Sequence, residues 1–170
     1  MLSCCGVSAE FREEQHPALH PGQSAVIIVA GKPVGWLGCI HPQLAQKLEI
    51  PRKTHLFELD LQILHQGKLP RFENLSRFPS IRRDLAIVVD VGTPAGALCS
   101  SITEQAGSLL TDLTVFDVYQ GKGVETGRKS VALGLILQDS SRTLTDDDVD
   151  AVMTGITGQL EKQFGATLRE

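Results

Sequence analysis

The chain has 170 residues, of which 42% are hydrophobic, 21% are charged and only 5% are aromatic. This length and composition are typical of one globular domain, or of one domain with part of another, and they require a largely aliphatic core. The formal net charge is −4, so bulk electrostatics exclude a generally basic nucleic-acid binder, and any such contact needs a local patch.

The first part of the chain predicts a small set of strands. Residues 1–15 form a poorly defined segment, and the His-Pro and Pro-Gly pairs of residues 16–23 predict an extended loop. Two apolar runs flanking Gly31-Lys32-Pro33 predict a hairpin, and THLFELDL alternates as a strand does. We therefore expect one unit at 16–67, with strands at 24–30, 34–40 and 54–61 and a helix at 43–48, and then a linker at 68–75.

The pattern changes in the last part of the chain, which we expect to be one domain at 76–169. Thr93-Pro94 and Thr145 are helix starts, and three aspartates after Thr145 favour the first turn of the second helix. The expected strands are 85–89, 113–119, 129–138 and 166–169. This β-α-β-β-α-β order predicts an α+β, ferredoxin-like fold, in which both helices cover one face of an antiparallel sheet and the other face is open.

Side-chain alternation predicts which residues line the open face. One set on the 129–138 strand is uniformly large and apolar, and it must pack on the helices: Val131, Leu133, Leu135 and Leu137. We expect Phe116 and Val118 to join that set, which leaves Asp117, Tyr119 and Ser130 together on the open face. A carboxylate, a ring and a hydroxyl suit an unstacked nucleobase. Alternatively, Tyr119 is an ordinary strand aromatic and Asp117 balances Lys129.

The last part resembles the ferredoxin-fold anticodon-binding domain of the bacterial phenylalanyl-tRNA synthetase β subunit. FPSIRRDLA, FDVYQG, GRKS and RTLTDDDV carry this resemblance, in that order. The first part resembles the tail of the same subunit's catalytic-like domain, through HPALHPGQSAVI, VGWLGCIHPQL and THLFELDL. Because the family's β subunit is far longer than 170 residues, the resemblance implies a C-terminal fragment.

The resemblance implies that the chain holds the anticodon stem-loop of phenylalanine tRNA. Asp117, Tyr119 and Ser130 would contact anticodon bases. Three basic residues at the same end of the sheet would neutralise phosphates: Lys122, Arg128 and Lys129. The implied partners are this tRNA, the synthetase α subunit and the remainder of the β subunit, with no membrane.

No catalytic site is expected in this chain. In the family the full enzyme is an ATP-dependent aminoacyl-tRNA ligase whose ATP and magnesium sites lie outside this sequence, so we expect no cofactor or metal here. His16 and His20 each precede a proline, which favours surface histidines over a zinc site. The four cysteines lack CxxC spacing and indicate reduced thiols in a cytoplasmic protein.

Two other functions stay open. The strands of 24–61 cannot bury both sheet faces alone, so the chain is alternatively a structural or assembly piece of the synthetase without independent RNA binding. A small enzyme on a ferredoxin-like fold is a third hypothesis, although no nucleophile, base or metal set is assembled in the sequence.

The three arginines of RFPSIRRDLAIVVD also suggest a nucleic-acid contact. In a ferredoxin-like sheet, however, the start of the first strand lies at the end opposite the 120–127 hairpin. We therefore expect Arg83 to pair with Asp84, and Arg77 and Arg82 to reach at most the backbone of an RNA stem.

Overall fold

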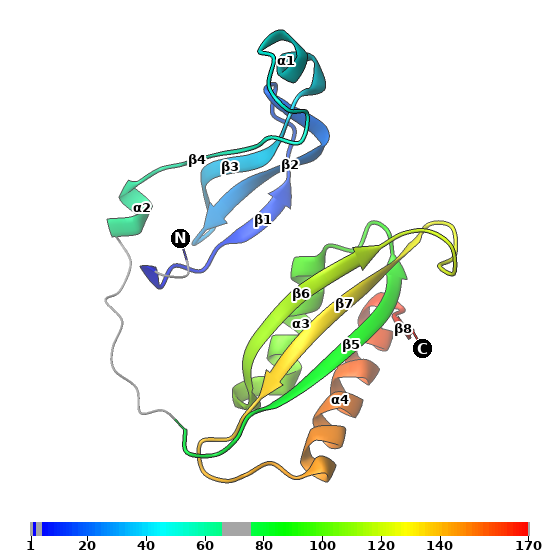
Figure 1. Ribbon diagram of the computed structural model, residues 1–170. Helices are drawn as coiled ribbons and strands as arrows, with labels where there is room; N and C mark the ends of the chain where they lie inside the picture. The colour runs from blue at the N-terminus through cyan, green and yellow to red at the C-terminus, as the bar shows by residue number, and fades with distance from the viewer. Residues whose placement is uncertain (1, 3–4, 66–75, 170) are drawn as a thin grey trace. The chain divides into compact units, whose positions relative to one another are not determined.

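The computed structural model describes residue 2, residues 5–65 and residues 76–169, and it divides the chain into two compact units, residues 1–73 and 74–170. Each unit has its own four-stranded sheet (Figure 1). The linker expected at 68–75 falls outside the described residues, as do the last two residues of the unit expected at 16–67. None of the described helices is long and apolar enough to cross a membrane.

The first unit is an antiparallel meander in the order β1-β2-β3-β4. Its elements are β1 (Glu10–Glu13), β2 (Leu19–Val29), β3 (Lys32–Ile40), α1 (Pro42–Lys47), β4 (His55–Leu59) and α2 (Gln62–His65). The expected hairpin, short helix and third strand are present. Strand β1 was not expected, because all four of its residues are exposed and it has no apolar periodicity. Strand β2 begins earlier than expected, since a register shift between Leu19 and Ser24 brings the His-Pro segment into the strand.

The three histidines that precede prolines in this unit make local turns. The Nδ1 atoms of His16, His20 and His41 accept hydrogen bonds from the backbone N–H two residues later, at 3.3, 3.1 and 3.2 Å. The bond at His41 caps helix α1. The ring of His16 also stacks on Trp36, with ring centroids 4.3 Å apart. These imidazoles therefore have structural roles in the turns.

The second unit has the ferredoxin-like order that the sequence predicts. Its elements are β5 (Ile81–Asp90), α3 (Ala95–Ala106), the 3-10 turn η2 (Gly107–Leu109), β6 (Leu110–Tyr119), β7 (Arg128–Leu137), α4 (Asp146–Phe164) and β8 (Thr167–Leu168). The sheet order is β6-β7-β5-β8, and every neighbouring pair is antiparallel. Helices α3 and α4 cover one face, and the other face carries no helix (Figure 1).

The core of this unit lies between the two helices and the sheet. Its side chains are aliphatic, as the composition requires, and the main contributors are Leu85, Ile87, Val89, Leu98, Ile102, Val131, Leu133, Leu135, Ile156 and Leu160. The apolar set on β7 is fully buried, as alternation predicts.

Strand β6 is not the regular strand that alternation assumed. Val115 pairs with Leu133 and Asp117 pairs with Ala132, so Phe116 is an extra residue in a β-bulge. Its ring is 53% exposed on the open face. The expectation that Phe116 faces the helices is therefore wrong, whereas Val118 pairs with Val131 on the helix side as expected but does not join the core cluster. Half of Val118 is also exposed, and the β6 residues that pack against the core are Leu110, Leu113 and Val115.

The two neighbouring arginines at the start of β5 lie on opposite faces, because strand side chains alternate. Arg82 Nε donates to Asp84 Oδ1 at 2.9 Å, and Arg83 reaches Asp146 at the start of α4 at 3.5 Å. The expected pair of Arg83 with Asp84 is therefore wrong, since adjacent residues of a strand do not share a face. The register does confirm that this end of the sheet lies opposite the hairpin, because Arg82 pairs with Ile136.

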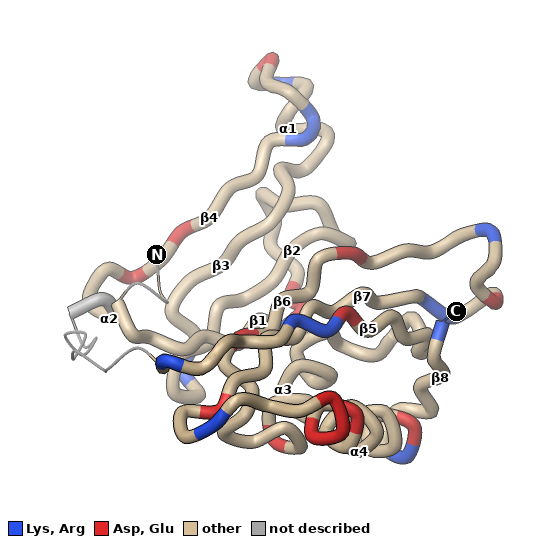
Figure 2. Tube along the Cα trace, turned by 60° about the horizontal axis from the view of Figure 1, so that its bottom comes forward, with Lys and Arg blue, Asp and Glu red and all other residues tan. Residues whose placement is uncertain are grey.

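A capping box holds the start of α4, where Figure 2 shows acidic residues gathered. The hydroxyl of Thr145 accepts a hydrogen bond from Asp148 N, and the Asp148 carboxylate accepts one from Thr145 N at 2.9 Å. Arg142 adds two hydrogen bonds to that carboxylate, at 2.6 and 2.8 Å. The bonds from Arg142, followed by those from Thr145, hold the pKa of Asp148 well below its usual range.

We expect Thr145→Ala to lower the free energy of unfolding by about 1 kcal/mol, because the cap hydroxyl is lost.

Asp148→Asn should reveal how the contribution of the Asp148 carboxylate to stability depends on pH. Since the folded pKa is depressed, Asp148 stabilises the fold fully above its unfolded pKa of about 3.9, and this contribution is lost as pH falls through the folded pKa. The difference in free energy of unfolding between wild type and Asp148→Asn, measured by urea unfolding, should thus become smaller as the pH is lowered from about 7 to about 2. A difference between the two proteins that stays the same at every pH would contradict this. Asp147→Asn is the control.

Candidate nucleic-acid interface

The open face of the second sheet gathers three of the residues that the sequence singled out. Tyr119 pairs with Ser130, and Asp117 pairs with Ala132, on neighbouring strands β6 and β7. Directly paired residues share a face of the sheet, so Asp117, Tyr119 and Ser130 lie on the face opposite the helices. The bulge at Phe116 is what puts Asp117 and Tyr119 there.

Tyr119 presents a partly exposed ring at the hairpin end of this face. The side chain is 38% exposed, and its hydroxyl donates a hydrogen bond to the Lys122 carbonyl at 3.3 Å. The ring lies close over the hairpin, since Tyr119 Oη is only 2.8 Å from the place where a Cβ on Gly121 would be. Gly121 also has a φ of +154°, so both its conformation and the ring above it favour glycine.

Arg169 is a residue that sequence reasoning missed. Its backbone N–H donates to the Ala86 carbonyl at 2.9 Å, which extends the pairing of β8. Its guanidinium lies 5.2 Å from the centroid of the Tyr119 ring, in a cation–π arrangement. No motif links the two residues in the sequence, because β6 and β8 belong to one sheet only in the fold, where β7 and β5 lie between them and the long Arg169 side chain reaches across.

Ser130 is less accessible than alternation alone suggests. It lies between Tyr119 on β6 and Val88 on β5, and only 4% of its surface is exposed. A ligand on this face would reach its hydroxyl only after the side chains around it move.

The three basic residues expected to contact phosphates have different surroundings. Lys122 is exposed in the hairpin loop, at the sheet end where Figure 2 shows basic residues. Arg128 donates hydrogen bonds to the carbonyls of Val88 and Gly165, at 2.8 and 2.7 Å, so its guanidinium anchors β7 to the end of α4. Lys129 pairs with the core residue Val89 and lies on the helix side of the sheet.

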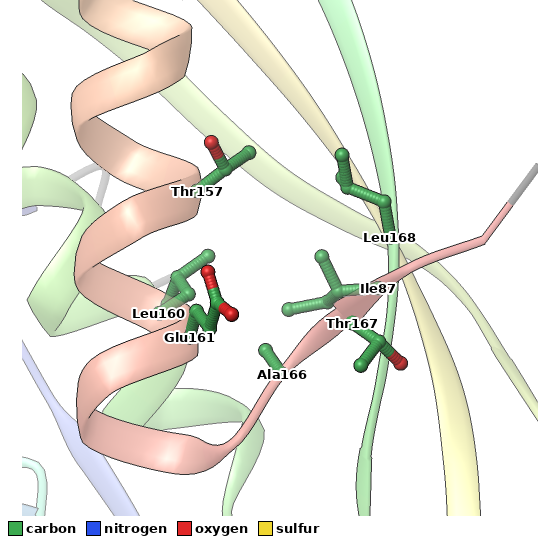
Figure 3. A pocket seen from close by; sticks show the side chains of 7 residues that line it. All are labelled: Ile87, Thr157, Leu160, Glu161, Ala166, Thr167 and Leu168. Carbon is green, nitrogen blue, oxygen red and sulfur yellow. The ribbon is translucent and has the colours of Figure 1, made fainter.

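The other side of the sheet offers a small cavity between α4 and β8 (Figure 3). It measures about 260 Å³, and it exists because β8 is only two residues long and leaves α4 uncovered at the sheet edge. Ile87 and Leu160 at its base belong to the core, and Glu161 is the one ionisable side chain among its lining residues. The cavity thus assembles no pair of groups for acid–base or nucleophilic chemistry.

The described residues show no assembled metal or nucleophile site. They contain no group of three His, Cys, Asp or Glu side chains placed to hold a metal ion. Cys5, Cys39 and Cys99 are free thiols, and burial raises the pKa of Cys99, which is the opposite of nucleophile activation. Cys4 lies outside the described residues. The open sheet face is therefore the better candidate for function.

The fold and this face define the class, a ferredoxin-like module with helices on one side of its sheet and an open side free for a ligand. Residues 76–169 match the family model described as ferredoxin-fold anticodon binding domain. Residues 1–61 match the model described as phenylalanyl tRNA synthetase beta chain CLM domain. The chain therefore belongs to the family of phenylalanine–tRNA ligase beta subunits.

Individual relatives agree with this assignment. The phenylalanine–tRNA ligase beta subunit of Methylococcus capsulatus is 52% identical over 163 residues, which cover 96% of this chain and 21% of the relative. The same subunit of Pseudomonas syringae pv. tomato is 51% identical over 172 residues, which cover 100% of this chain and 22% of the relative. The subunit of Coxiella burnetii is 48% identical over 160 residues, which cover 94% of this chain and 20% of the relative. The chain thus spans about a fifth of the length of these curated relatives.

Proposed function

We propose that this chain holds the anticodon stem-loop of phenylalanine tRNA and contributes recognition without catalysis. The observation that carries the proposal is the exposed ring of Tyr119 beside Asp117, on the open face of an anticodon-binding domain. A ring of this kind stacks on an unpaired base, and a carboxylate accepts hydrogen bonds from a base edge. Lys122 at the same end is placed to meet a phosphate.

The proposal extends to the larger enzyme of the family. The chain would act together with the synthetase α subunit and the remainder of a β subunit, and ATP and magnesium would be used elsewhere in that enzyme. A cytoplasmic location goes with this role, and it is supported by the free thiols of Cys5, Cys39 and Cys99.

A titration of the full chain with two RNAs tests the proposal. One is the anticodon stem-loop of phenylalanine tRNA, and the other is the same stem-loop with altered anticodon bases. We expect the native loop to bind more tightly by about tenfold or more, because losing a base contact costs about 1–3 kcal/mol. The difference should persist at several salt concentrations, since phosphate contacts alone are strongly salt-dependent. Equal binding of both stem-loops would refute base recognition.

The first unit supports a second candidate, a structural or assembly piece of the synthetase. One face of its sheet has a depression of about 580 Å³, and the two large rings there, Phe11 and Phe57, are 61% and 65% exposed. An apolar surface of this kind favours contact with another protein surface. The titration above separates the two candidates, because an assembly piece would bind neither stem-loop.

A further inference from the structure

The open face carries a second feature, a hollow at the end away from the hairpin. It has a volume of about 140 Å³ and is lined by Arg82, Asp112, Thr114, Phe116, Gly134 and Ile136. Pockets for drug-sized ligands are usually about 300–1,000 Å³, so this hollow has room for a single ring system. Neither Tyr119 nor Ser130 lines it, and so it is a site separate from the one described above.

Two local features create the hollow. The bulge turns the Phe116 ring onto the open face, with Cδ1 3.7 Å from the place where a Cβ on Gly134 would be. Gly134 itself has no side chain, so the floor between Phe116 and the pair of Arg82 and Asp84 stays open. An aromatic side wall next to a bare strand floor is the shape that accepts a flat ring.

The charges around the hollow select a base over a phosphate. The Asp84 and Asp112 carboxylates stand against one guanidinium, that of Arg82, so the local charge repels a phosphate. Arg82 binds Asp84 through Nε, and its Nη2 lies 3.4 Å from the would-be Cβ of Gly134, directed at the hollow. A base with an exocyclic amino group matches this set, because the amino group donates to a carboxylate and a ring nitrogen accepts from arginine.

We infer that this hollow is a second base-binding subsite, which takes one unpaired base with an amino group, such as adenine, in preference to uracil. The inference rests on the proposed function, since it places a further base of the same RNA strand on the sheet face that also carries Tyr119. The bases would then lie against the acidic sheet face, and the phosphates would point away toward solvent.

Gly134→Ala tests the subsite with little disturbance to the fold. The added methyl group would lie 3.4–3.7 Å from Arg82, Asp84 and Phe116, which is ordinary contact, and it would fill the floor of the hollow. The full chain is titrated with oligo(A), oligo(U) and the anticodon stem-loop, and thermal unfolding checks that the variant is folded. We expect Gly134→Ala to weaken oligo(A) binding by about tenfold, the scale of one lost base contact, and to leave oligo(U) binding nearly unchanged.

Phe116→Ala, with Val118→Ala as its matched control, gives a second measurement. Both side chains are about half exposed on the same strand, but Val118 pairs with Val131 on the helix side. Phe116→Ala should weaken oligo(A) binding, and Val118→Ala should bind as wild type does. Unchanged oligo(A) binding by Gly134→Ala would overturn the subsite. The two proposals can also fail separately. If wild type binds both stem-loops equally, the proposed function fails; if it still prefers oligo(A) and Gly134→Ala abolishes that preference, the subsite stands.

Discussion

Tyr119→Ala should weaken binding of the anticodon stem-loop by about 1–3 kcal/mol, which is the scale of one base–aromatic stack. The ring is partly exposed at the hairpin end of the open face, and the hydrogen bond of its hydroxyl to the Lys122 carbonyl fixes its orientation before a base arrives. Fluorescence anisotropy titrations of wild type and variant, at two salt concentrations, measure this difference.

Tyr119→Phe is the matched control for this experiment. It keeps the ring and the cation–π contact with Arg169, and it removes only the hydroxyl that donates to Lys122. We expect it to retain most of the affinity that Tyr119→Ala loses. Wild-type affinity in Tyr119→Ala would show that the ring is an ordinary strand aromatic, as the alternative interpretation of the sequence holds.

Leu133→Ala should lower the free energy of unfolding of the second unit by about 2–5 kcal/mol. The side chain is fully buried at the centre of β7, where it pairs with Leu85 on one side and with Val115 on the other. Removing its methyl groups leaves a cavity that the sheet and both helices cannot collapse to fill.

Urea unfolding followed by circular dichroism measures this loss. Val118→Ala on the neighbouring strand is the control, because its side chain is already half exposed and should cost far less. A cost below about 1 kcal/mol for Leu133→Ala would mean that the core is looser than its burial indicates.

The sequence predicts the fold of the second unit because its signals are local. Thr145 and Gly165 bound α4, where the cap hydroxyl and the left-handed glycine conformation satisfy the ends of the helix. The uniform apolar set on β7 identifies the helix side of the sheet. Strand β1 escaped prediction because it is short and fully exposed, so burial leaves no periodic pattern in its sequence.

The candidate site could be predicted only in part, since it depends on contacts between distant residues. Alternation correctly placed Asp117 and Tyr119 away from the helices, but it assigned Phe116 to the wrong face because a bulge has no fixed sequence signature. The contact of Arg169 with Tyr119 and the burial of Ser130 arise from strand pairing, which alternation within one strand does not describe.

The bulge in β6 has a consequence for how this domain can diverge. In a regular strand, Leu113, Val115, Asp117 and Tyr119 would all lie on one face, and a new ligand would require changes among core residues. With Phe116 as an extra residue, Leu113 and Val115 face the core while Asp117 and Tyr119 lie on the open face. Substitutions of Asp117 and Tyr119 can therefore alter specificity while the packing is kept, so that stability and recognition evolve separately along a single strand.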